Sequence, residues 1–289
     1  MNQGRNVFRA VVLTLGFAFL YGPIVSLVVY SFNASKLVTV WGGFSTKWYG
    51  ELVHNDQILG AAWLSLRVAT LSATISVVLG TLAGMALARF GPFKGRTLLS
   101  GLTTAPLVMP EVITGLSLLL LFVTMEQLIG WPKGRGFTTI VISHITFTMA
   151  FVTVIVQSRL SQMDDSLEEA AMDLGARPSR VFFLITLPII FPALLSGWLL
   201  ALTLSLDDLV ITSFVAGPGS NTLPMVIFSK VRLGVSPDIN ALATILVTLV
   251  SIGAVVAGIV QNRRQQERER DAQMALAANQ QMIESLKKS

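Results

Sequence analysis

Three carboxylates lie within or directly beside apolar stretches, where a charge is costly. Glu111 lies near the middle of the apolar segment 97–125, and Asp207 and Asp208 lie in the outer half of the apolar segment that contains the uncharged stretch 181–206. An ionised side chain at the centre of a bilayer costs about 2.5–3.5 kcal/mol on insertion scales, so such groups normally face a pathway or a partner. Carboxylates there attract cations, and several weak acidic contacts would let a cation pass without trapping it. The alternative is structural: they cap a broken helix or pair with a basic group across an interface.

The two aspartates cannot both face one point. Consecutive residues lie about 100° apart on a helix, and Asp208 shares its stripe with Ser205 and Thr212. Such polar faces predict a helix that borders a cavity or a partner subunit. The candidate residues of a solute pathway are therefore Asp207, Asp208 and Glu111.

A polar loop, residues 158–187, carries the signals of a short helix. Asp164 or Asp165 can cap it, and acidic residues follow in its first turn, where they suit the helix dipole. Gly175 then ends the helix, as a left-handed C-terminal position requires. The predicted helix, 165–174, is apolar on one side, through Leu167, Ala170, Ala171 and Leu174. These residues alone predict an amphipathic helix at the membrane surface, or a simple interfacial connector.

The rest of the chain has the composition of a membrane protein. Hydrophobic residues make up 53% of the 289 residues and charged residues only 13%, against about 25% charged in soluble domains. About 20 apolar residues cross the hydrocarbon core, and six stretches qualify: 10–35, 68–88, 97–125, 136–158, 181–206 and 239–262. We therefore predict an all-α polytopic membrane protein with six transmembrane helices.

Lysine and arginine in the short connections predict the orientation. If the N-terminus is cytoplasmic, more of these residues fall on the cytoplasmic side than outside, even when the C-terminal tail is left out. Both termini are thus expected in the cytoplasm. Residues 1–6 would precede a transmembrane domain, 7–262, with the cytoplasmic loop 158–187, and 263–289 would form a polar tail. The basic residues are scattered and form no stripe, which argues against nucleic-acid binding.

Two features in the apolar stretches predict packing. Gly80 and Gly84 form a GxxxG pattern, which lets helices approach closely in a membrane. His144 is expected to be a satisfied packing residue.

The loop also resembles a known signature. At every fixed position it is similar to the EAA motif of ABC-importer membrane subunits: Glu169-Ala170-Ala171, Gly175, Ile185 and Leu187-Pro188. Residues 7–260 resemble the permeases of putrescine and spermidine importers, and the putrescine type more closely. The segments that carry this resemblance are 41–52, 105–122, 166–176 and 196–219. It implies the type I ABC-importer permease fold.

The resemblance further implies roles and partners. The loop helix would dock into a groove of a cytoplasmic ATPase, with Glu169 as a contact, the alanines closely packed and Gly175 permitting the turn. The implied coupling residues are Glu168, Glu169, Ala170, Ala171, Asp173 and Gly175. The partners would be a second permease subunit, an ATPase dimer and a periplasmic polyamine-binding protein. In a bacterial inner membrane, the chain would translocate putrescine or spermidine by alternating access.

The sequence restricts the alternatives to this interpretation. It lacks a GxxxxGK[ST] motif, so ATP and Mg²⁺ would be bound by the partner ATPase, and we expect no catalytic residue and no cofactor in this chain. It has no cysteine and two histidines, which leaves no thiolate or histidine-rich metal centre. An ABC permease for another cationic solute or metal stays open. So does an ion-coupled secondary transporter, although such proteins usually show internal repeats and no convincing repeat is visible.

Overall fold

A computed structural model describes residues 2–37, 40–234 and 237–253, and single positions from 255 to 270 (255, 256, 258, 259, 263, 265, 266 and 270). The chain forms two compact units. One comprises Met1–His54 with Val235–Ser289, and the other comprises Asn55–Gly234.

The first unit contains a long apolar helix and an anchored connection. Helix α1 (Asn2–Ser31) leads through an irregular segment to α2 (Lys47–Val53). The indole nitrogen of Trp48 donates to the backbone oxygen of Asn33 (2.6 Å), and the hydroxyls of Ser31 and Tyr49 lie 2.6 Å apart. These bonds tie α2 to the end of α1. The unit also includes a shorter apolar helix, Pro237–Gly253.

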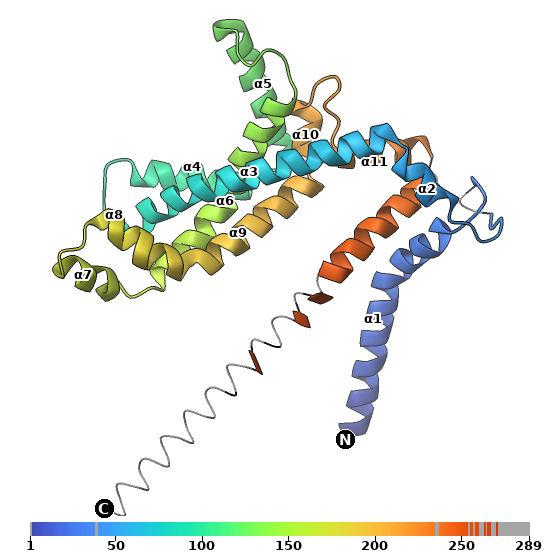
Figure 1. The fold of residues 1–289 in the computed structure, drawn as a ribbon, viewed down its shortest axis with the longest axis horizontal. Helices are drawn as coiled ribbons and strands as arrows, with labels where there is room; N and C mark the ends of the chain where they lie inside the picture. Colours follow the sequence, from blue (N-terminus) through green and yellow to red (C-terminus); the bar gives the residue numbers. More distant parts are fainter. Residues whose placement is uncertain are drawn as a thin grey trace, which may run out of the picture. The chain divides into compact units, whose positions relative to one another are not determined.

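The second unit is built on three helices that pack side by side (Figure 1). These are α3 (Asp56–Arg89), α6 (Phe137–Ser161) and α9 (Leu187–Asp207). Helix α4 (Arg96–Val108) lies against α6, whereas α5 (Glu111–Ile129) projects away from the three and packs on α10 (Val210–Val215). At one end lie α7 (Ser166–Asp173), α8 (Pro178–Val181) and the π-helical turn η1 (Phe182–Thr186), while α11 (Leu223–Leu233) contacts α3.

Small residues bring α3 and α6 into close contact. A Cβ added at Gly80 would lie 2.8 Å from Cβ of Val152, and one at Gly84 would lie 3.1 Å from Cβ of Val156. The hydroxyls of Ser76 and Thr148 meet at 2.7 Å across the same interface. The packing role predicted for the GxxxG pattern is confirmed.

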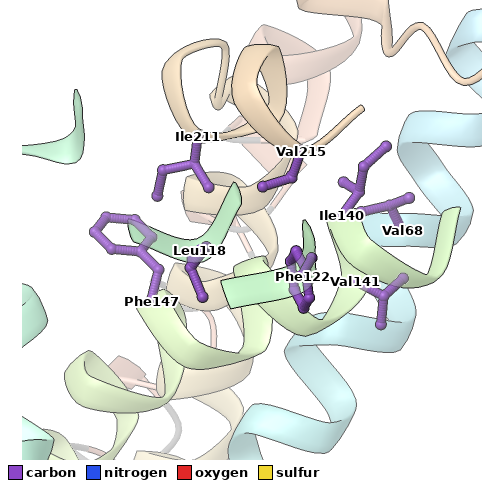
Figure 2. Packing of buried hydrophobic residues seen from close by; sticks show 8 residues of the cluster. All are labelled: Val68, Leu118, Phe122, Ile140, Val141, Phe147, Ile211 and Val215. Carbon is purple, nitrogen blue, oxygen red and sulfur yellow. The ribbon is translucent and has the colours of Figure 1, made fainter. Parts of the chain in front are cut away.

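A buried apolar cluster joins α5 and α10 to this bundle (Figure 2). Its members come from α3, α5, α6 and α10: Val68, Leu118, Phe122, Ile140, Val141, Phe147, Ile211 and Val215. On α5, Gly115 faces the ring of Phe214 and the backbone of Ile211, so its lack of a side chain permits the contact. The cluster therefore holds in place the helices that flank the carboxylates.

The predicted spans are confirmed in part. Within the described residues, five helices are long and apolar enough to cross a membrane: Val7–Ser31, Asp56–Arg89, Glu111–Ile129, Phe137–Ser161 and Pro178–Asp207. The sixth predicted span, 239–262, lies partly outside the described residues, as does most of the tail, 263–289. The second span starts earlier than predicted, because the side chain of Asn55 accepts a bond from the amide of Ile58 and caps α3 there.

The third predicted span is wrong as a single helix. Helix α4 ends at Val108, Met109 is extended, and α5 begins at Glu111. Pro110 explains the break, because proline lacks an amide donor and disfavours the helical conformation of the residue before it. Glu111 consequently lies in the first turn of a new helix, and not near the middle of a continuous span.

Candidate functional site

The loop predicted to couple the chain to a partner folds into a well-terminated short helix. The Asp164 carboxylate accepts a bond from the amide of Ser166 (3.0 Å), and this hydrogen bond lowers the pKa of Asp164. At the other end, the amide of Ala176 bonds to the carbonyl of Ala171, and that of Gly175 to the carbonyl of Met172. These are the two bonds of a Schellman motif. Gly175 has a φ of +86°, so the predicted left-handed position is confirmed.

Helix α7 turns most of its side chains outward. None of its residues is buried, and Leu167, Met172 and the following Leu174 are 49%, 43% and 90% exposed. Glu169, Ala170 and Asp173 are exposed as well, and Ala171 is half-buried. Apolar side chains exposed beside acidic ones are typical of a surface that contacts another protein or the membrane.

Glu168 is the exception among the predicted coupling residues. Its Oε1 accepts a bond from the Thr186 hydroxyl (2.5 Å), and its Oε2 lies 3.3 Å from Nε of Arg89. Arg89 also forms an ion pair with Asp165. The Glu168 side chain is 17% exposed and that of Asp165 is 66% exposed. Glu168 therefore holds α7 against its own chain, and sequence reasoning missed both Arg89 and Thr186.

The second predicted group, at the end of α9, sits at a helix break. Helix α9 ends at Asp207, and Asp208 adopts an extended conformation (φ −64°, ψ 123°) before α10 begins. The Asp208 carboxylate accepts bonds from the amides of Ile211 (3.2 Å) and Thr212 (2.8 Å) and from the Thr212 hydroxyl (2.6 Å). It thus satisfies free amides at the start of α10 and places negative charge at the positive end of that helix.

His144 of α6 completes this buried network. Its Nε2 lies 3.1 Å from the Asp208 carboxylate and 2.9 Å from the Thr212 hydroxyl, and its Nδ1 lies 2.5 Å from the Ser205 hydroxyl. A neutral imidazole protonated at Nε2 fits these contacts, because the single Nε2 proton is shared between Asp208 and Thr212 while Nδ1 accepts from Ser205. The expectation that His144 is a satisfied packing residue is confirmed. The stripe of Ser205, Asp208 and Thr212 was predicted to border a cavity or a partner subunit, whereas in the structure all three side chains contact His144 of the same chain.

The remaining candidate carboxylates are accessible. Asp207 and Glu111 are exposed, whereas Asp208 is 8% exposed. The adjacent aspartates thus occupy opposite environments: Asp208 is buried and stabilises the helix break, and Asp207 is exposed. That any of the three contacts substrate stays a prediction.

Comparison with known proteins places this architecture in a family. The profile of the family described as "Binding-protein-dependent transport system inner membrane component" matches residues 76–268. The chain is 57% identical to the putrescine transport system permease protein PotI of Escherichia coli K12, over 94% of this chain and 96% of that protein. It is 42% identical to the spermidine/putrescine transport system permease protein PotC of the same organism, over 88% and 94%.

Solved structures share the fold. A bacterial ABC transporter that imports the acidic polysaccharide alginate superposes with a TM-score of 0.70, covering 90% of this chain and 96% of that one at 16% identity. The MetNI methionine ABC transporter superposes with a TM-score of 0.56, covering 70% and 92% at 18% identity. The chain belongs to the family of binding-protein-dependent inner-membrane transport components: it is a permease subunit of an ABC transporter and lies in the inner membrane.

Proposed function

We propose that this chain imports a polyamine, putrescine in preference to spermidine. The observation that carries the proposal is the 57% identity to the putrescine permease across nearly the whole length of both chains, against 42% to the spermidine/putrescine permease. The fold alone does not identify the substrate, because similar folds occur in transporters of an acidic polysaccharide and of methionine. An ABC permease for another cation is the alternative.

The partners in this proposal follow from the architecture of such importers. The chain pairs with a second permease, sits on an ATPase dimer and receives substrate from a periplasmic binding protein. The exposed face of α7, with Glu169 and the apolar side chains of Leu167 and Leu174, is the surface that docks into the ATPase. ATP-driven closure of the ATPase moves α7, and the pore opens toward the binding protein. Release of ADP returns it to the inward-facing state.

The accessible carboxylates are the proposed polyamine contacts within the chain. Asp207 and Glu111 each lie beside a helix break, at the end of α9 and at the start of α5. Exposed charges at broken helices meet a solute while the neighbouring helix ends stay fixed by their own bonds. Asp208, which the sequence placed in the same pathway, contributes chiefly by holding the break that presents Asp207.

Uptake of labelled putrescine and spermidine tests the proposal, in cells that lack this subunit and are complemented with wild type, Asp207→Asn or Asp208→Asn. We expect wild type to restore putrescine uptake more than spermidine uptake. At equal amounts of protein in the membrane, Asp207→Asn should lower uptake up to about fivefold, because an exposed charge contact contributes about 0.2–1 kcal/mol. Asp208→Asn should instead lower the amount of folded protein. Failure of wild type to restore either amine would contradict the substrate assignment.

A further inference from the structure

Three side chains join the docking helix to the membrane helices. We infer that Arg89, Glu168 and Thr186 form an internal link that transmits movement of α7 to α3 and α9. The inference rests on the proposed docking of an ATPase on α7. It assigns Arg89 and Thr186 as positioning residues and gives Glu168 a role distinct from that of its neighbour Glu169.

The two oxygens of Glu168 bind two different elements. Oε1 accepts from the hydroxyl of Thr186, the last residue of η1, and Oε2 faces the guanidinium of Arg89, the last residue of α3. Glu168 is mostly shielded from solvent, so its contacts are screened less by salt than those of the exposed Asp165. A displacement of α7 therefore acts on α3 and on the start of α9 at once.

Arg89 depends on these carboxylates. Within the described part of the chain, its Nε and Nη2 atoms are buried and make no hydrogen bond that meets normal geometry. Its charge is balanced by Glu168 and Asp165. Removing one partner of a buried ion pair is strongly destabilising, because the other charge is left uncompensated. The pair consequently resists separation when α7 moves.

The link leads into a helix that runs across the unit. Thr186 is 2% exposed and ends a π-helical turn, a distortion that often occurs at functional sites. Helix α9 starts at the next residue and runs for 21 residues, about 30 Å, to Asp207. Glu169, adjacent to Glu168, is exposed. The two glutamates thus have separate roles: Glu169 meets the ATPase, and Glu168 connects α7 to α3 and to the start of α9, which ends at the acidic break.

The test uses the reconstituted complex of this chain with its partner permease, ATPase and binding protein. It compares Glu168→Gln, Arg89→Gln, the double variant Arg89→Gln/Glu168→Gln and the matched control Arg159→Gln, an exposed arginine in the last turn of α6. Three quantities are measured: ATPase retained on purification, ATP hydrolysis stimulated by putrescine-loaded binding protein, and labelled putrescine transported per ATP hydrolysed. The double variant leaves no unpaired buried charge, so it folds even where a single variant does not.

We expect the double variant to retain the ATPase and to transport roughly 5- to 150-fold less putrescine per ATP, the usual range of coupling between sites. Arg159→Gln should match wild type, and the charge swap Arg89→Glu/Glu168→Arg should recover part of the coupling. Normal transport per ATP by the double variant would overturn the inference. Loss of the ATPase from the double variant would also overturn the inference, because Glu168 would then be a docking contact. Wild type that binds the ATPase but transports no polyamine would contradict the proposed substrate alone. The ATP hydrolysis of the complex without polyamine, compared between the double variant and wild type, would then decide the link: equal rates would overturn it.

Discussion

At the scale of single residues, the buried network around His144 explains how a charged residue is accommodated at a helix break. The Asp208 carboxylate accepts hydrogen bonds from two amides of α10, from the Thr212 hydroxyl and from the imidazole of His144. Each polar group in the network has a partner, which is the condition for burying a carboxylate without a large penalty. The break therefore has a fixed geometry, and Asp207 takes its exposed position from it.

Replacing His144 tests this explanation. His144→Ala leaves Asp208 and Ser205 short of a partner, and we expect it to lower the free energy of unfolding by about 1–3 kcal/mol. The matched control is His54→Ala, the other histidine, which is exposed and should change stability by less than about 0.5 kcal/mol. Thermal denaturation of the purified variants in detergent measures both changes in stability. Equal effects of the two substitutions would show that the network contributes nothing.

Sequence reasoning reached part of this residue-scale picture. It predicted the left-handed Gly175, which follows from helix geometry within a few residues. It also grouped Ser205, Asp208 and Thr212, but on one face of a continuous helix, whereas the helix breaks at Asp208. It did not pair Asp208 with His144, which lies 64 residues away, nor Glu168 with Arg89. Contacts between distant segments depend on how helices pack, and periodicity along the chain does not contain that information.

At the scale of elements, close packing of α3 on α6 organises the second unit. Gly80 and Gly84 remove the side chains that would keep the helices apart, and Ser76 bonds to Thr148 across the interface. In a membrane, helices associate through such close packing and through hydrogen bonds, because lipid is as apolar as their side chains. The α3–α6 pair is therefore the frame on which α9 and α4 are placed.

Adding a methyl group at this interface should lower the stability of the protein. In Gly80→Ala the new Cβ would meet Val152 at 2.8 Å, and overpacking of this kind costs about 1–3 kcal/mol. Gly101→Ala in α4 is the control, because nothing lies within 4 Å of its added Cβ and alanine is favoured over glycine in a helix by up to about 1 kcal/mol. Thermal denaturation in detergent should show opposite shifts. A shift of the same sign and size for both would contradict the interface.

Apolar composition predicted which segments are helical but not where the third of them breaks. Membrane helices tolerate proline when neighbours satisfy the freed backbone groups, so Pro110 did not by itself decide between a kinked helix and two helices. In the structure α4 lies on α6 and α5 packs on α10, and these separate contacts favour the break. As a result, Glu111 lies in the first turn of α5 and not, as predicted, near the middle of one continuous span.

At the scale of the whole molecule, the two surfaces that we propose to be functional, the exposed face of α7 and the acidic break, lie on one compact unit. The exposed α7 lies at one end of this unit (Figure 1), and α9 runs from the neighbouring turn to the acidic break. The comparisons show an ABC permease subunit, and in our proposal this subunit converts movement at α7 into movement around Asp207. The EAA-like spacing implied the family and the docking role of α7 from sequence, since its residues lie within one loop; the docking role stays a prediction.

The most direct test of the central claim is putrescine accumulation in proteoliposomes that contain the full complex, with wild type or Glu169→Lys. We predict ATP-dependent accumulation with wild type. Glu169→Lys, which reverses a charge on the exposed face of α7, should lose the stimulation of ATP hydrolysis by loaded binding protein and lose transport, at an unchanged amount of folded chain in the membrane. Normal ATP-dependent transport by Glu169→Lys, or putrescine accumulation by wild type without the ATPase, would contradict the claim.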